Sequence, residues 1–264
     1  MSIIDGGNDG SDAGGKGRPI IVPGREAMAK PLPLRFYKDV SLGLSGPPPG
    51  HTILLDGRMA RTPGKRELRL TTMALAEAVA TEWASQGTQI DPQRMPLTRL
   101  VNTALDGVAG RMADVAADVV KYAGSDLLCY RADFPEGLVA RQRLHWDPVL
   151  AWADERHGVR LTVGSGLMPV TQPDEAGPRI AAAVAHLDAF GLTALHVMTT
   201  LMGSALLGLA VIEGRLDPEA AWTAAHVDED WQISEWGEDA EAMARRERRW
   251  SEMQAAATLA RLAG

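Results

Sequence analysis

A long apolar run, ALHVMTTLMGSALLGLAVIEG at residues 194–214, is the feature that most constrains how this chain folds. A helix that crosses a membrane needs about 20 predominantly apolar residues, so the length alone permits a span. The run, however, contains a histidine, two threonines and Ser204, and no cationic residue lies close to its N-terminal end. We therefore expect a central helix buried on most sides in a globular core. Gly203 and Gly208 would let neighbouring helices approach it closely.

Helical patterns dominate the chain from Met112 onward. Apolar residues recur there at spacings of three and four, and Gly and Pro separate the segments. One extended piece, VRLTVG at 159–164, interrupts them. The pattern predicts helices at about 111–123, 136–157, 174–189, 192–213, 217–236 and 239–262.

The sequence before residue 110 favours strands. RFYKDVSLGL at 35–44 and ELRLTT at 67–72 each predict one strand. Between them, HTILLDGRMAR at 51–61 predicts a hairpin that turns at Asp56 and Gly57. The three segments together indicate a small antiparallel sheet.

Two threonines mark the helices that follow these strands. Thr72 predicts the N-cap of a helix that ends near residue 86, and Thr98 that of a helix through about residue 108. The chain is therefore predicted to be an α+β protein without internal repeats. We divide it into a disordered tail at 1–30, an N-terminal α+β domain at 31–110 and a helical domain at 111–264.

The composition argues against several classes of protein. A net charge of -7 is unlike the basic field of a nucleic-acid binder. The single cysteine, Cys129, cannot form an internal disulfide and fits a reducing compartment. The N-terminus lacks both the apolar core of a signal peptide and the arginine-rich pattern of a transit peptide. We therefore expect a protein of the bacterial cytosol, without stable membrane insertion.

No motif in the sequence predicts catalysis. There is no GxGxxG after a strand, no phosphate-binding loop, no HExxH and no CxxC. His226, Asp228 and Asp230 resemble a metal cluster only in composition, because residues two apart on a helix face different ways. Cys129 lies in an apolar run and is expected to be buried and unreactive. We predict no catalytic residue, no metal and no cofactor.

The most unusual stretch is DEDWQISEWGED at 228–239, which combines carboxylates with tryptophans. It ends a predicted helix that begins at Asp217 and stops at Gly237. In such a helix one stripe contains Trp222, Ala225, Glu229, Gln232, Ile233 and Trp236, while Asp228, Asp230 and Glu235 fall to its sides.

Glu229 is thus a carboxylate among tryptophans, and three interpretations remain open. The first is a structural ion pair with Arg245 or Arg246. The second is a polar anchor in an aromatic surface that binds a partner. The third is an acid/base hydrolase that uses Glu229 with His226 or Asp230.

A family resemblance bears on this choice. The segments LDGRMARTP, LAEAVATEWASQGTQIDPQRMPLTRLVNTALD, YAGSDLLCYRA, QRLHWDPVLAW and WQISEWG resemble, in this order, the Atp-twelve family over residues 34–260. The resemblance implies an α+β domain followed by a helical domain, and no enzymatic activity. It also implies a chaperone that holds the unassembled alpha subunit of ATP synthase and shields its beta-facing surface until beta displaces it. Family members occur in alphaproteobacteria and in mitochondria, where the matrix is their location.

The resemblance also implies site residues. Glu229, Gln232, Trp236 and Gly237 match the C-terminal block of the family. The earlier blocks are matched by Met95, Pro96, Thr98, Asp106, Asp126, Tyr130, Arg131 and Trp146. We predict that Glu229, Gln232, Trp236, Trp231 and Trp222 form the partner-binding surface of a monomer or weak oligomer. A general adaptor for helical partners is the remaining alternative.

Overall fold

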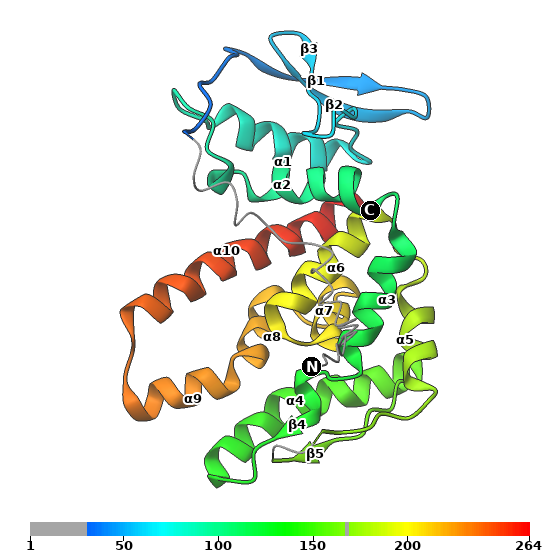
Figure 1. The fold of residues 1–264 in the computed structure, drawn as a ribbon, viewed down its shortest axis with the longest axis vertical. Helices are drawn as coiled ribbons and strands as arrows, with labels where there is room; N and C mark the ends of the chain where they lie inside the picture. The colour runs from blue at the N-terminus through cyan, green and yellow to red at the C-terminus, as the bar shows by residue number, and fades with distance from the viewer. Residues whose placement is uncertain (1–30, 167–168) are drawn as a thin grey trace, which may run out of the picture.

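The computed structural model describes residues 31–166 and 169–264, so the tail predicted at 1–30 lies outside the described residues. A small sheet lies at one end of the molecule, and the helices extend away from it (Figure 1). The sheet and the mostly helical remainder confirm the predicted α+β class.

The sheet contains three antiparallel strands in the order β1-β2-β3. The predicted hairpin turn is confirmed, because Asp56 and Gly57 both have positive φ between β2 and β3. The first predicted strand starts later than expected, at Val40. The segment 67–72 forms only isolated bridges at Glu67 and Leu70 rather than a strand. The strands are β1 (Val40–Ser45), β2 (Gly50–Leu55) and β3 (Arg58–Met59).

Helix α1 (Met73–Ala84) covers one face of the sheet (Figure 1). Thr72 is its N-cap, as predicted, and accepts a hydrogen bond from the amide of Leu75. Leu75 and Val79 are fully buried between α1 and the strands, which holds the helix on the sheet.

Thr98 is not the N-cap that the sequence predicted. Helix α2 (Pro96–Thr103) begins two residues earlier, and the amides of Leu97 and Thr98 both donate to the carboxylate of Glu82, at 2.8 and 2.7 Å. The capping group therefore comes from α1 rather than from the start of α2 itself. A π-helical segment, η3 (Ala104–Val108), follows α2 directly.

The remaining chain is mostly helical and contains two short strands that pair in parallel. The predicted helix at 136–157 is observed with the same bounds, and Gly158 ends it in the left-handed conformation. These elements are η2 (Pro92–Arg94), α3 (Met112–Ala123), η4 (Leu127–Cys129), β4 (Tyr130–Arg131), α4 (Glu136–His157), β5 (Gly164–Ser165), α5 (Ala176–Val184), α6 (Ala189–Met202), α7 (Ala205–Ile212), α8 (Pro218–Ala225), α9 (Val227–Trp236) and α10 (Ala240–Ala263).

The apolar run forms the centre of the core, as predicted, but it is two helices rather than one. Gly203 ends α6 with a φ of 69°, and Ser204 caps α7 by accepting from the amide of Leu207. Asp126, from another part of the chain, accepts from the amide of Leu206. In the described parts of the chain, no helix is both long and apolar enough to span a bilayer.

Helix α10 connects the helical part of the molecule to the end that contains the sheet. It packs against α6 and α2, and the hydroxyl of Thr71 donates to the carbonyl of Ala263 at 2.7 Å, beside the sheet. Helix α2 and η3 also contact α6. The division into domains at residue 110 stays a prediction.

Candidate functional site

The helix predicted at 217–236 is interrupted at His226, which separates α8 from α9. The imidazole Nδ1 of His226 is 2.7 Å from the carbonyl oxygen of Trp222, and the two rings lie 3.9 Å apart. The buried imidazole thus contacts the last turn of α8, at the residue where the helix is interrupted. The predicted single stripe is wrong, because Trp222 and Trp236 now belong to helices that run in different directions (Figure 1).

Trp222 is largely a core residue. It is 8% exposed, its ring lies 5.4 Å from that of Trp250, and the guanidinium of Arg249 lies 5.9 Å from its centre. It therefore connects α8 with α10 and is not part of the surface that contains Trp236.

Trp231 attaches α9 to α4. Its indole lies so close to Gly137 that a Cβ at that position would be 2.6 Å from the ring, and the guanidinium of Arg141 lies 4.9 Å from the ring centre. On the same side of α9, the amide of Gln142 donates to Asp228 at 2.7 Å. These contacts leave Trp231 partly buried, so it positions α9 rather than presenting a free aromatic face.

The structural ion pair of Glu229 with Arg245 or Arg246, one of the three interpretations, is not observed. Arg246 pairs with Asp230 at 2.5 Å, and Arg245 pairs with Glu241 at 2.5 Å. Within residues 31–166 and 169–264, the basic group that lies within ion-pair distance of Glu229 is His226, at 3.9 Å. Burial lowers the pKa of His226, so its imidazole is neutral at pH 7. The side chain of Glu229 is 55% exposed and forms no ion pair with a lysine or arginine among the described residues.

A groove of about 620 Å³ lies between α9 and the first half of α10. Among the described residues it brings together Glu229, Gln232 and Trp236, and Trp236 is 88% exposed. We call it the α9/α10 groove; its lining residues are Glu229, Gln232, Ile233, Trp236, Gly237, Asp239, Ala242, Met243, Arg245, Arg246 and Arg249.

The groove combines apolar surface with one free acidic group. Arg246 is neutralised by Asp230 and Arg245 by Glu241, whereas Arg249 keeps its positive charge and donates to the carbonyl of Leu201. Asp239 caps α10 by accepting from the amide of Ala242. Glu229 is therefore the carboxylate in the groove that remains available for a partner.

The structure offers little support for metal or acid/base chemistry here. No group of three His, Cys, Asp or Glu side chains suited to a metal ion occurs in the described ranges 31–166 and 169–264. Of the two proposed acid/base partners of Glu229, Asp230 pairs with Arg246 instead, and the Nε2 of His226 lies 3.9 Å from the Glu229 carboxylate, which is longer than a hydrogen bond. Cys129 is buried, and burial together with the Asp126 carboxylate raises its pKa to about 12, which leaves it a protonated thiol.

Comparison with known proteins identifies the family. The family described as ATP12 chaperone protein matches residues 34–154. The crystal structure of Atp12 from Paracoccus denitrificans is similar over 88% of this chain and 99% of that chain, with 44% identity and a TM-score of 0.83. This chain belongs to the ATP12 chaperone family. A chaperone candidate from Agrobacterium tumefaciens is also similar, with 47% identity, a TM-score of 0.84 and coverage of 89% of this chain and 88% of that chain.

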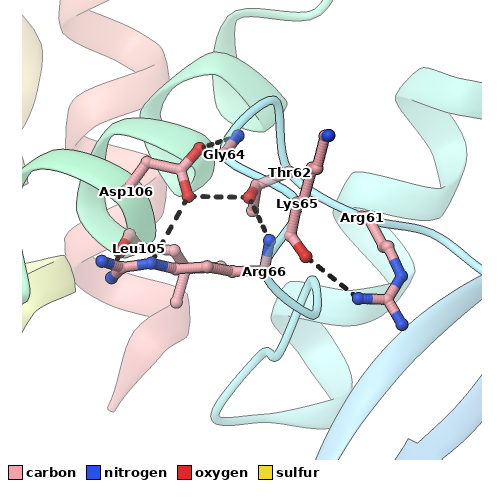
Figure 2. Close-up of polar contacts among 7 residues, drawn as sticks. All are labelled: Arg61, Thr62, Gly64, Lys65, Arg66, Leu105 and Asp106. Atoms are coloured by element: carbon pink, nitrogen blue, oxygen red, sulfur yellow. Dashed lines mark hydrogen bonds and ion pairs between the residues drawn. The ribbon is translucent and has the colours of Figure 1, made fainter.

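Asp106, which the resemblance assigned to an earlier family block, has a structural role. The carboxylate of Asp106 accepts from the amide of Gly64 and from the hydroxyl of Thr62, each at 2.7 Å (Figure 2). The Arg66 guanidinium lies 3.9 Å from the same carboxylate and donates to the carbonyl of Leu105 (Figure 2). Asp106 thus attaches the loop after the sheet to η3, directly after α2.

Two further ATP12 residues hold the helical part together. Asp126 is fully buried and accepts from the amides of Leu128 and Leu206. The indole of Trp146 donates to the carbonyl of Ala224 at 2.7 Å, and the guanidinium of Arg131 lies 5.1 Å from its ring centre.

The sequence did not indicate three residues that position helices, two of which fix α9 beside the groove. Glu82 caps α2, and Gln142 and Gly137 fix α9 on α4. Of these three, only Gly137 could have been noticed in the sequence. A glycine in the first turn of a long helix is unfavourable without a packing reason.

Proposed function

We propose that this protein binds the unassembled alpha subunit of ATP synthase during assembly of the F-one head and shields its beta-facing surface until beta displaces it. Membership of the ATP12 chaperone family is the observation that carries the proposal. We propose that it acts in the bacterial cytosol, as a monomer or weak oligomer and without catalysing a reaction.

The physical need for such a partner is simple. An isolated alpha subunit exposes apolar surface that later meets beta, and large unpaired surfaces of this kind aggregate. A chaperone must cover that surface and later release it, so moderate affinity is required.

The α9/α10 groove suits this requirement and is the surface we propose for the client. Trp236 supplies exposed aromatic area, Ile233 and Met243 supply apolar lining, and Glu229 supplies one charge that orients the client. Gln232 adds a polar side chain that donates and accepts hydrogen bonds. Trp231 and Trp222 act indirectly, because they hold α9 and α10 in place.

Selective capture tests the proposal. Tagged protein would be mixed with separately expressed alpha and beta subunits and recovered on the tag. We expect recovery of alpha and not of beta. Capture of neither subunit would contradict the proposal, and equal capture of alpha and unrelated helical proteins would favour the general adaptor instead.

Release is tested with the purified complex. Adding beta should free the chaperone without ATP hydrolysis, because beta competes for the same surface of alpha. A complex that persists with excess beta and dissociates only on hydrolysis would contradict release by displacement.

A further inference from the structure

A second hollow lies on an adjacent face of α10. It has a volume of about 790 Å³ and lies between α8 and the first half of α10, and Figure 1 shows α9 and this part of α10 projecting beyond α8. We call it the α8/α10 groove; its lining residues are Glu219, Trp222, Thr223, Glu238, Ala240, Met243, Ala244, Arg246, Glu247 and Trp250.

The floor of the α8/α10 groove is apolar and aromatic. The rings of Trp222 and Trp250 lie 5.4 Å apart, and Met243, Ala240 and Ala244 extend the apolar surface along α10. Trp222 is mostly covered by its neighbours, whereas Trp250 is partly exposed. Such a floor accommodates apolar side chains of a partner.

The rim of the groove is acidic. Glu219, Glu238 and Glu247 are exposed, and none of them forms an ion pair within the described part of the chain. The arginine in the lining, Arg246, is already neutralised by Asp230. The groove therefore presents three unbalanced carboxylates around an aromatic floor.

We infer that the α8/α10 groove binds a second segment of the client, one in which apolar side chains stand beside lysine or arginine. This inference rests on the proposed function, since it takes the alpha subunit as the client. Charge complementarity selects the cationic segment, because an acidic segment would meet three like charges.

The two grooves share Met243 and Arg246, so they lie on adjacent faces of α10. A client that fills both would cover these two faces of the first half of α10. Two modest contacts on one rigid element give tighter binding than either alone, since the second contact forms within the complex. They also let beta displace the chaperone from the client one contact at a time.

Photocrosslinking to the alpha subunit tests where the client lies. A benzoylphenylalanine would replace Ala244, which lines the α8/α10 groove, or Ala242, which lines the α9/α10 groove. Ala151, exposed on α4 and outside both grooves, is the control position. We expect crosslinks from positions 244 and 242 to different client peptides, with lysine or arginine close to the peptide crosslinked at 244.

Charge reversal tests the chemistry of the same groove. We expect Glu247→Lys and Glu219→Lys each to weaken alpha-subunit binding by roughly fivefold. Glu235→Lys is the matched control, because Glu235 is exposed on α9 and lines neither groove. Melting temperatures of all variants should equal that of the wild type to within a few degrees.

The outcomes separate the two proposals. If the wild type captures alpha but position 244 gives no crosslink, or Glu247→Lys and Glu219→Lys bind normally, the second groove is not a client surface and the proposed function stands. If the wild type captures no alpha subunit, the proposed function and this inference both fail.

Discussion

Asp230, rather than its neighbour Glu229, holds Arg246, at a distance of 2.5 Å. This pair connects α9 to α10 across the base of the α9/α10 groove and leaves Glu229 without a cationic partner among the described residues other than the neutral His226. One residue thus stabilises the site, and the adjacent one remains free to contact a client.

Asp230→Asn should therefore lower stability slightly. The two side chains are 36% and 19% exposed, and ion pairs of this kind contribute at most about 1 kcal/mol. Thermal unfolding of Asp230→Asn and of Glu229→Gln measures the difference. We expect a lower melting temperature for Asp230→Asn alone; an equal loss in Glu229→Gln would show that Glu229 is also part of a structural pair.

Gly137→Ala should loosen α9 from α4. A Cβ at this position lies 2.6 Å from the Trp231 ring, so the ring must move, at a cost of about 1–3 kcal/mol. In a Trp231→Ala background the same change should be neutral or stabilising, because alanine favours the helix. Urea unfolding of the two single variants and the double variant gives the coupling, and additive effects would contradict the packing described for Trp231.

Asp106→Ala should weaken the attachment of the loop at residues 61–66. The change removes two 2.7 Å hydrogen bonds to a carboxylate, which are each worth about 1.5–3 kcal/mol. Hydrogen exchange at the amide of Gly64 should become faster, and Asp106→Asn, which keeps one acceptor, should show a smaller effect. Unchanged exchange at Gly64 in Asp106→Ala would contradict this role.

The buried carboxyl of Asp126 predicts a pH dependence. Burial raises its pKa from 3.8 to about 6, so the folded protein binds the proton more tightly than the unfolded chain does. Its contribution to stability is present in full below about pH 4 and is lost as the pH rises through 6. Relative to Asp126→Asn, the unfolding free energy of the wild type should fall by roughly 2–3 kcal/mol between pH 4 and 7.

Denaturant unfolding of the wild type and of Asp126→Asn across this pH range measures the difference in unfolding free energy. The other carboxyls titrate in both proteins, so their effect cancels in this difference. A difference that rises with pH would instead show that the amides of Leu128 and Leu206 favour the ionised form more strongly than burial opposes it.

Local signals predicted much of the fold. Thr72 at the start of α1, Asp217 at the start of α8 and Gly158 at the end of α4 act within their own segments, and the sequence identified the helices at these places. The central apolar run was likewise predicted as core, because its length and polar residues disfavour a span.

The errors arise where distant residues decide the local structure. Ser204 starts a new helix where Asp126 accepts from the amide of Leu206, and the α2 N-terminus is capped by Glu82 from α1. Neither Asp126 nor Glu82 can be inferred from the periodicity of the helix that it contacts. The sequence also did not predict the break at His226. Because of this break, the residues of the one predicted stripe separate into a buried Trp222 and an exposed Trp236.

The central claim is that the α9/α10 groove holds the alpha subunit through Glu229. The most direct test is a binding titration of isolated alpha subunit with the wild type, Glu229→Lys and the control Glu235→Lys, with melting temperatures measured in parallel. We expect Glu229→Lys to weaken binding by roughly tenfold or more at an unchanged melting temperature, while Glu235→Lys binds as the wild type does. Equal affinity of all three proteins would contradict the claim.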